Sequence, residues 1–92
     1  MLDRVKLALR ISHNALDMEI LETISAARSE MVRAGVPESV AAGDSSLVTM
    51  AVKTYCLSVL HADQKVREGY AEAFKYQLDN IRKSDMGELA NV

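Results

Sequence analysis

A chain of 92 residues has room for one small domain, which buries too little apolar surface to be very stable without a partner. Because 49% of the residues are apolar and only one is proline, the composition excludes a disordered chain, and the shortage of aromatic residues favours helices. The formal net charge of −2 argues against a protein held to nucleic acid by a general positive field. The single cysteine excludes an internal disulfide and fits a reducing compartment, and no basic and apolar leader opens the chain, so we expect no export.

Two helices are expected in the first half of the chain. The first covers residues 2–10, where Leu2, Val5 and Leu9 share one face. The second covers residues 16–34, because apolar residues recur there at steps of three or four: Leu16, Ile20, Ile24, Ala27, Met31 and Ala34. We expect Asp17 or Asn14 to cap its start. Gly35 is placed to close it in a left-handed conformation, and residues 36–44 then form a connection that contains the only proline.

The third expected helix, over residues 45–62, is apolar nearly all round. Its sequence is SSLVTMAVKTYCLSVLHA, in which Lys53 is the only full charge. A helix of this kind is buried or spans a membrane, and its hydroxyl residues, lysine and histidine favour burial. We therefore predict a central helix, capped by Asp44, Ser45 or Ser46, that the rest of the chain and neighbouring subunits enclose.

The last expected helix covers residues 63–83. It carries Gly69 in its interior, at a cost of about 1 kcal/mol relative to alanine, which close packing would compensate. Residues 84–92 lose the periodicity and are predicted to be a mobile tail. The sequence thus predicts an all-α fold, a small bundle of about four helices in a single domain over residues 1–83.

No catalytic motif is present in the sequence. The candidate nucleophile and its candidate partners are Cys56, His13 and His61, and Cys56 and His61 lie five residues apart, which on a helix turns them away from each other. We interpret Cys56 as a core residue and His61 as the end of the central helix, where the helix dipole favours it. The chain is therefore predicted not to be an enzyme, and to need no cofactor.

Two charged clusters have a functional and a plain interpretation. The acids Asp17, Glu19 and Glu22 could be ligands of a metal, but a solvated helix start that matches the helix dipole explains them, so no metal is predicted. The basic residues of the first helix, Arg4, Lys6 and Arg10, could contact phosphates. A small helical DNA-binding regulator that uses this basic helix is the alternative function.

The order of elements resembles the head–tail connector (adaptor) proteins of tailed bacteriophages. The resemblance rests on VKLALRI at residues 5–11, LDMEILETISAA at residues 16–27 and AGV at residues 34–36. The apolar third helix through Tyr55 and the spacing of Tyr70 and Phe74 extend it over nearly the whole chain, and it is greatest to the short members from phages and prophages of Gram-positive bacteria.

What the resemblance implies is a structural virion protein without enzymatic activity. Such a protein would be made in the bacterial host cytoplasm and would act at the head–tail junction of the virion, away from any membrane. It would form a ring of about twelve subunits beneath the portal protein, extend the channel through which double-stranded DNA passes, and offer a platform to the stopper or tail-completion protein. A net negative charge suits such a channel, because it repels phosphate.

Two sets of residues are expected to make these contacts. The interface between subunits is assigned to residues of the second and third helices: Ile24, Met31, Leu47, Met50, Tyr55 and Leu57. The contacts with the portal or the channel are assigned, by position in the resemblance, to the connection and the tail: Val36, Pro37, Glu38, Asp44, Asp85 and Leu89.

Overall fold

The computed structural model describes the backbone of residues 1–90 and the side chains of residues 1–83. Every regular element in this part of the chain is a helix: α1 (Leu2–Leu9), α2 (Asp17–Arg33), α3 (Glu38–Ala41), α4 (Ser46–Leu60) and α5 (Gln64–Ala90). The helices form one elongated body with dimensions of 45 × 25 × 19 Å. The prediction of a small all-α bundle is confirmed.

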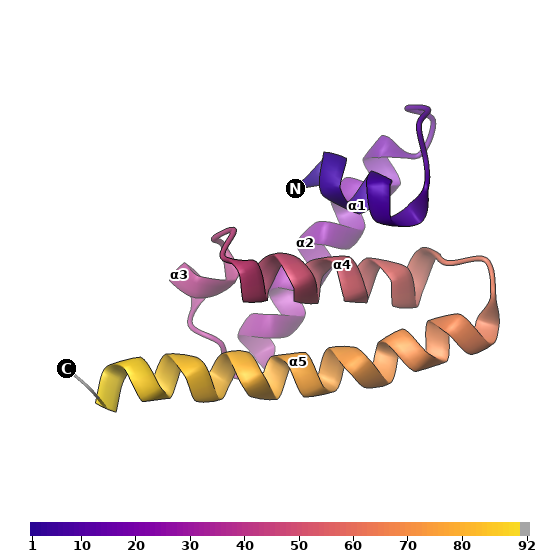
Figure 1. Ribbon diagram of the computed structural model, residues 1–92. Helices are drawn as coiled ribbons and strands as arrows, with labels where there is room; N and C mark the ends of the chain where they lie inside the picture. Colours follow the sequence, from indigo (N-terminus) through magenta and orange to yellow (C-terminus); the bar gives the residue numbers. More distant parts are fainter. Residues whose placement is uncertain (91–92) are drawn as a thin grey trace.

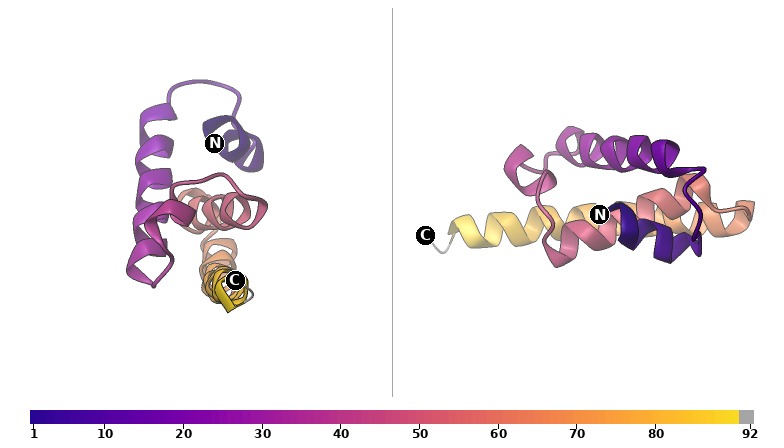
Figure 2. Two further views of the ribbon diagram at one scale, coloured as in Figure 1. Left: turned by 90° about the vertical axis from the view of Figure 1, so that its left-hand side faces the viewer. Right: turned by 90° about the horizontal axis from the view of Figure 1, so that it is seen from above.

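Helix α4 lies at the centre of the bundle. It forms an antiparallel hairpin with α5, and α1 and α2 also pack against it, while the short α3 contacts α2 (Figure 1). In the view along the hairpin, α1 and α5 lie on opposite sides of α4 and α2 covers a third side (Figure 2, left). The helix with the most apolar sequence is therefore the one that the other helices enclose.

The core draws side chains from every helix. Among the described side chains, α2 and α4 contribute four buried apolar residues each, whereas α1, α3 and α5 contribute one or two each. The buried apolar residues are Val5, Ile20, Ile24, Ala27, Met31, Val36, Ala41, Val48, Ala51, Val52, Cys56, Phe74 and Ile81. The inward stripe predicted for the second helix is thus buried from Ile20 to Met31, although Leu16 at its start stays 39% exposed.

Two hydroxyl groups of α4 are buried without a loss of hydrogen bonds. Thr54 Oγ1 donates to the carbonyl oxygen of Met50 at 2.9 Å, and Thr49 Oγ1 donates to the carbonyl oxygen of Asp44 at 3.3 Å. A buried hydroxyl without a partner would cost free energy, so these local bonds let a helix that is covered on several sides carry threonine.

Two helix ends form as the sequence predicts. Gly35 follows α2 with a φ of 104°, and the N–H of Val36 donates to the carbonyl oxygen of Met31 at 2.9 Å, which closes the helix with buried Val36 packed beneath it. At the start of α4, Ser45 Oγ accepts a hydrogen bond from the N–H of Val48 at 3.3 Å.

The predicted cap of α2 is wrong. Leu16 occupies the N-cap position, and no side chain bonds to the first turn there. Lys6 of α1 takes both candidate caps: its Nζ donates to Asn14 Oδ1 at 2.9 Å and lies 2.8 Å from Asp17 Oδ1, a carboxylate oxygen without another partner. A cation from another helix outcompetes the local capping bond, because it neutralises the carboxylate as well.

Three further expectations need correction. The connection over residues 36–44 contains the single-turn helix α3, whose four residues are too few to show a periodic pattern. Helix α5 continues through residues 84–90, past the end predicted at Lys83, because most residues there favour helix although they lack an apolar stripe. Gly69 is not closely packed, since a Cβ built on it would meet no atom within 4 Å.

Candidate interaction surfaces

The predicted subunit interface is only partly available at the surface. Leu47 is 44% exposed and Met50 is 56% exposed, on the outward side of α4, and Val59 near the end of the helix is 49% exposed. Ile24 and Met31, by contrast, are 6% and 0% exposed and lie in the core of the single chain. The assignment of these two residues to a subunit interface is wrong, because the helical stripe that they share packs against α4 within the same chain.

The remaining two interface candidates on α4 are half-buried. The ring of Tyr55 meets the ring of Phe74 edge to face, with centroids 5.1 Å apart, and so holds α4 to α5. Leu57 also keeps part of its surface exposed. Each therefore contributes to the fold of the chain and offers a neighbour only part of its side chain.

The predicted portal and channel contacts also divide by exposure. Pro37, Glu38 and Asp44 are exposed around α3. Val36 is 2% exposed, so its assignment as a contact residue is wrong, because it closes the end of α2 from inside. The other two candidates, Asp85 and Leu89, lie outside the residues whose side chains are described.

Helix α2 has a second side that the sequence analysis missed. It carries no full charge and consists of residues at helical spacing, which we call the outer stripe: Met18, Leu21, Ser25, Ser29 and Val32. Met18 is 71% exposed, Leu21 46% and Val32 42%. The spacing of three or four is present in the sequence, but these residues are less apolar than those of the inward stripe on the same helix.

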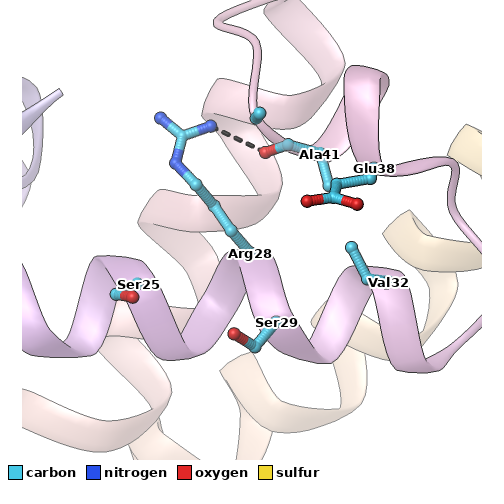
Figure 3. Close-up of a pocket in the computed structure, with 7 residues that line it drawn as sticks. Ser25, Arg28, Ser29, Val32, Glu38 and Ala41 are labelled. Atoms are coloured by element: carbon cyan, nitrogen blue, oxygen red, sulfur yellow. Dashed lines mark hydrogen bonds between the residues drawn. The ribbon is translucent and has the colours of Figure 1, made fainter.

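Beside the outer stripe, a hollow of about 390 Å³ opens between α2 and α3. Its lining is formed by Ser25, Arg28, Ser29, Val32, Glu38, Ala41 and Ala42, and Figure 3 shows Arg28 reaching from α2 to α3 at one side of it. The hollow combines small side chains and alanines with one carboxylate and one guanidinium. It contains no pair of groups arranged for acid–base or nucleophilic chemistry.

Arg28 fastens α2 to the segment that leads into α4. Its Nη1 donates to the carbonyl oxygen of Ala41 at 2.8 Å (Figure 3). The same Nη1 donates to the carbonyl oxygen of Gly43 at 2.6 Å, and Nη2 donates to Asp44 Oδ1 at 2.8 Å. The hydrogen bond from Arg28 holds the pKa of the Asp44 carboxyl below its ordinary value of 3.8. Since the guanidinium is occupied in this way, Arg28 acts as a structural tie.

The basic residues of α1 do not form a free cationic patch. Lys6 is paired with Asp17, as described above, and Arg4 Nη1 lies 3.5 Å from Thr49 Oγ1 of α4. Arg10 is exposed just beyond the helix in a left-handed conformation, with a φ of 59°. Three cations that face one phosphate backbone together would have favoured nucleic-acid binding, and this arrangement does not favour it.

The candidate nucleophile Cys56 and the two histidines each have a structural role in the fold. Cys56 is fully buried in the core, and burial raises the pKa of its thiol to about 11, which disfavours the nucleophilic thiolate. His13 Nδ1 accepts a hydrogen bond from the N–H of Ala15, and His61 Nδ1 accepts one from the N–H of Asp63, each within its own turn. Within the described residues, no group of three or more histidine, cysteine or acidic side chains is placed to hold a metal ion.

Comparisons with known proteins add no relative: no family model, no curated protein and no solved structure matches the chain. None of the helices in the described part has the combination of length and hydrophobicity that a membrane crossing requires.

Proposed function

We propose that this chain is a structural subunit that assembles with copies of itself into a ring and joins the head of a tailed bacteriophage to its tail. In this role it docks beneath the portal protein, extends the channel for double-stranded DNA and receives the stopper or tail-completion protein. It works without a catalytic site, a cofactor or a metal. The support is the sequence resemblance given above, together with an all-helical fold of suitable size and an outward apolar strip on α4.

The observation that carries the proposal is the exposure of Leu47 and Met50. They lie on the most apolar helix of the chain, whose other apolar residues are largely enclosed, and yet they are 44% and 56% exposed. Large apolar side chains left at the surface together mark an interaction site more often than an isolated one does. Cyclic assembly gives such a strip a place to be buried on every subunit, because each copy contacts the next one head to tail.

Light scattering after size exclusion tests the proposal, with the chain alone and mixed with portal protein. We expect higher oligomers of the chain, or a complex with portal. We expect Met50→Asp to abolish them, because it places a charge in the interface between subunits. Val59→Asp is the matched control, because Val59 is 49% exposed on the opposite side of the same helix.

The contradicting outcomes are equally clear. A wild-type chain that stays monomeric and does not bind portal would refute the ring. Equal loss of assembly in Met50→Asp and Val59→Asp, with both variants folded by circular dichroism, would refute the assignment of the subunit interface to the outward strip of α4, formed by Leu47 and Met50.

A further inference from the structure

The outer stripe of α2 has the properties of a helix-pairing surface. It runs along the whole 17-residue helix without a full charge, and its centre consists of the small residues Ser25 and Ser29, one turn apart. Small residues at this spacing let another helix approach closely, and the larger Leu21 and Val32 flank them on either side. We propose that two copies of this chain pair through their outer stripes, antiparallel about a two-fold axis.

The register follows from the pattern of sizes. When Ser25 of one copy lies opposite Ser29 of the other, Leu21 of one copy lies opposite Val32 of the other. The two-fold axis repeats both contacts. The small residues at the centre then meet each other, and Leu21 meets Val32 on both sides of them. Symmetry of this kind requires one patch to be complementary to itself, and the outer stripe meets that requirement.

Charge complementarity selects the antiparallel orientation. Glu22 and Arg33 lie on the same flank of the outer stripe, toward opposite ends of α2. In the antiparallel pair, Glu22 of each copy comes near Arg33 of the other, whereas a parallel two-fold pair would place these flanks on opposite sides of the contact, where Glu22 and Arg33 do not meet. Arg33 is free to change partner, because its present bond, to Glu30 Oε2 at 2.9 Å, joins two side chains that are 80% and 40% exposed.

The other flank of the stripe brings no unpaired charge into the contact. Asp17 is bound by Lys6, and Arg28 is bound by the carbonyl oxygens of α3 and the following turn. The hollow between α2 and α3 continues the stripe on this flank, and Val32 stands at its lining (Figure 3). In the proposed register, Leu21 of the second copy faces Val32 at this hollow, which gives its side chain a place to be buried.

A second groove among the residues that the structure describes fits a second copy less well. It is lined by Val66, Gly69, Tyr70 and Ala73 on the outward side of α5. By helical spacing, Arg67, Glu68 and Glu72 lie on the side of α5 away from this groove, so an antiparallel pairing centred on Gly69 and Ala73 would bring no opposite charges together at its centre. The outer stripe of α2 has the complementary pair of Glu22 and Arg33 beside it, so the second copy belongs there.

The contact is small. A helix of this length is about 25 Å long, so the contact of one helix with another is smaller than the total of about 1,200–2,000 Å² that stable interfaces bury. We therefore expect a weak dimer, with a dissociation constant on the order of 10 µM. Pairing through one self-complementary patch closes at two copies. The proposal does not rest on the ring described above, which uses the outward strip of α4, and a dimer can form whether or not the ring exists.

Sedimentation velocity from about 5 to about 500 µM tests the pairing, with the full chain carrying Met50→Asp so that ring formation through α4 does not contribute. We expect a monomer–dimer equilibrium. Glu22→Arg should raise the dissociation constant at least about tenfold, because the new arginine of each copy then faces Arg33 of the other. The double exchange Glu22→Arg/Arg33→Glu should restore the dissociation constant to within about threefold of its original value. Glu19→Arg makes the same change of charge on the same helix away from the stripe and should leave it unchanged.

Each alternative result overturns the pairing. A chain that is monomeric throughout this range, a dimer that Glu22→Arg and Glu19→Arg weaken equally, or a double exchange that fails to restore the dimer would each refute it. Circular dichroism of every variant confirms that the monomer is folded.

Disulfide trapping checks the register independently. Cys56 is fully buried, so a chain with Ser25→Cys or Ser29→Cys has one accessible thiol. On mild oxidation, an equimolar mixture of the two variants should form several times more disulfide-linked dimer than either variant alone. A mixture of Ser29→Cys with Ala71→Cys, which is exposed on α5, gives the background. Yields at this background would refute the register.

Discussion

The guanidinium of Arg28 donates a hydrogen bond to the carbonyl oxygen of Ala41 at 2.8 Å and so ties α2 to α3. The same Nη1 reaches Gly43, which places the turn that leads into the central helix. Without this side chain, partly buried carbonyl groups at the end of α3 would lose their partners. The geometry of the segment between α2 and α4 therefore depends on one residue.

Replacement of Arg28 tests this dependence. We expect Arg28→Ala to lower the free energy of unfolding by about 2 kcal/mol, because it removes two charge-assisted bonds to partly buried carbonyl oxygens. Arg33→Ala, at an exposed position of the same helix, should change it by less than about 0.5 kcal/mol. Urea unfolding of the three proteins measures the difference, and equal effects of the two replacements would contradict the structural role of Arg28.

The ion pair between Arg28 and Asp44 predicts a dependence of stability on pH. The pKa of Asp44 is lowered in the folded chain, so its contribution is fully present above the unfolded value and is lost as the pH falls through the folded one. Wild type should therefore lose more stability than Asp44→Asn between about pH 5 and pH 2. Denaturant unfolding across this range measures the two profiles, and parallel profiles would show that Asp44 does not contribute.

The two glycines Gly69 and Gly35 should respond to alanine in opposite directions. Gly69 lies inside α5, with nothing within 4 Å of an added Cβ, so Gly69→Ala should raise the free energy of unfolding by about 1 kcal/mol. Gly35 has a φ of 104°, where a side chain is strained, and Gly35→Ala should lower it by about 1 kcal/mol. Thermal unfolding followed by circular dichroism compares them, and destabilisation by Gly69→Ala would mean that the open side of α5 is occupied.

The burial of Cys56 predicts an unreactive thiol. Because its pKa is raised to about 11, native protein near pH 8 should react with a thiol reagent far more slowly than unfolded protein in concentrated guanidinium. The rate of labelling should follow the rate at which the core opens or the fraction of molecules in which it is open. Rapid labelling of the folded chain would contradict the position of Cys56 between the central helix and its neighbours.

The sequence by itself determined the helices and the helix that lies at their centre. Periodicity predicted the inward stripe of α2, the central position of the apolar helix over residues 45–62 and the closing role of Gly35, because these follow from patterns of residues that lie close together in the sequence. Short or weakly periodic segments escaped it for the same reason, as α3 and the continuation of α5 past Lys83 show.

Tertiary structure alone decided which surfaces are left for a partner. Ile24 and Met31 lie in the core, whereas Met50 and the outer stripe of α2 are exposed. Lys6 of α1 forms an ion pair with Asp17 of α2 across the turn between the two helices. Each of these outcomes depends on the side of one helix that another helix covers. Which side of a helix is covered is decided when separate helices pack, and it cannot be read from the residues of that helix alone.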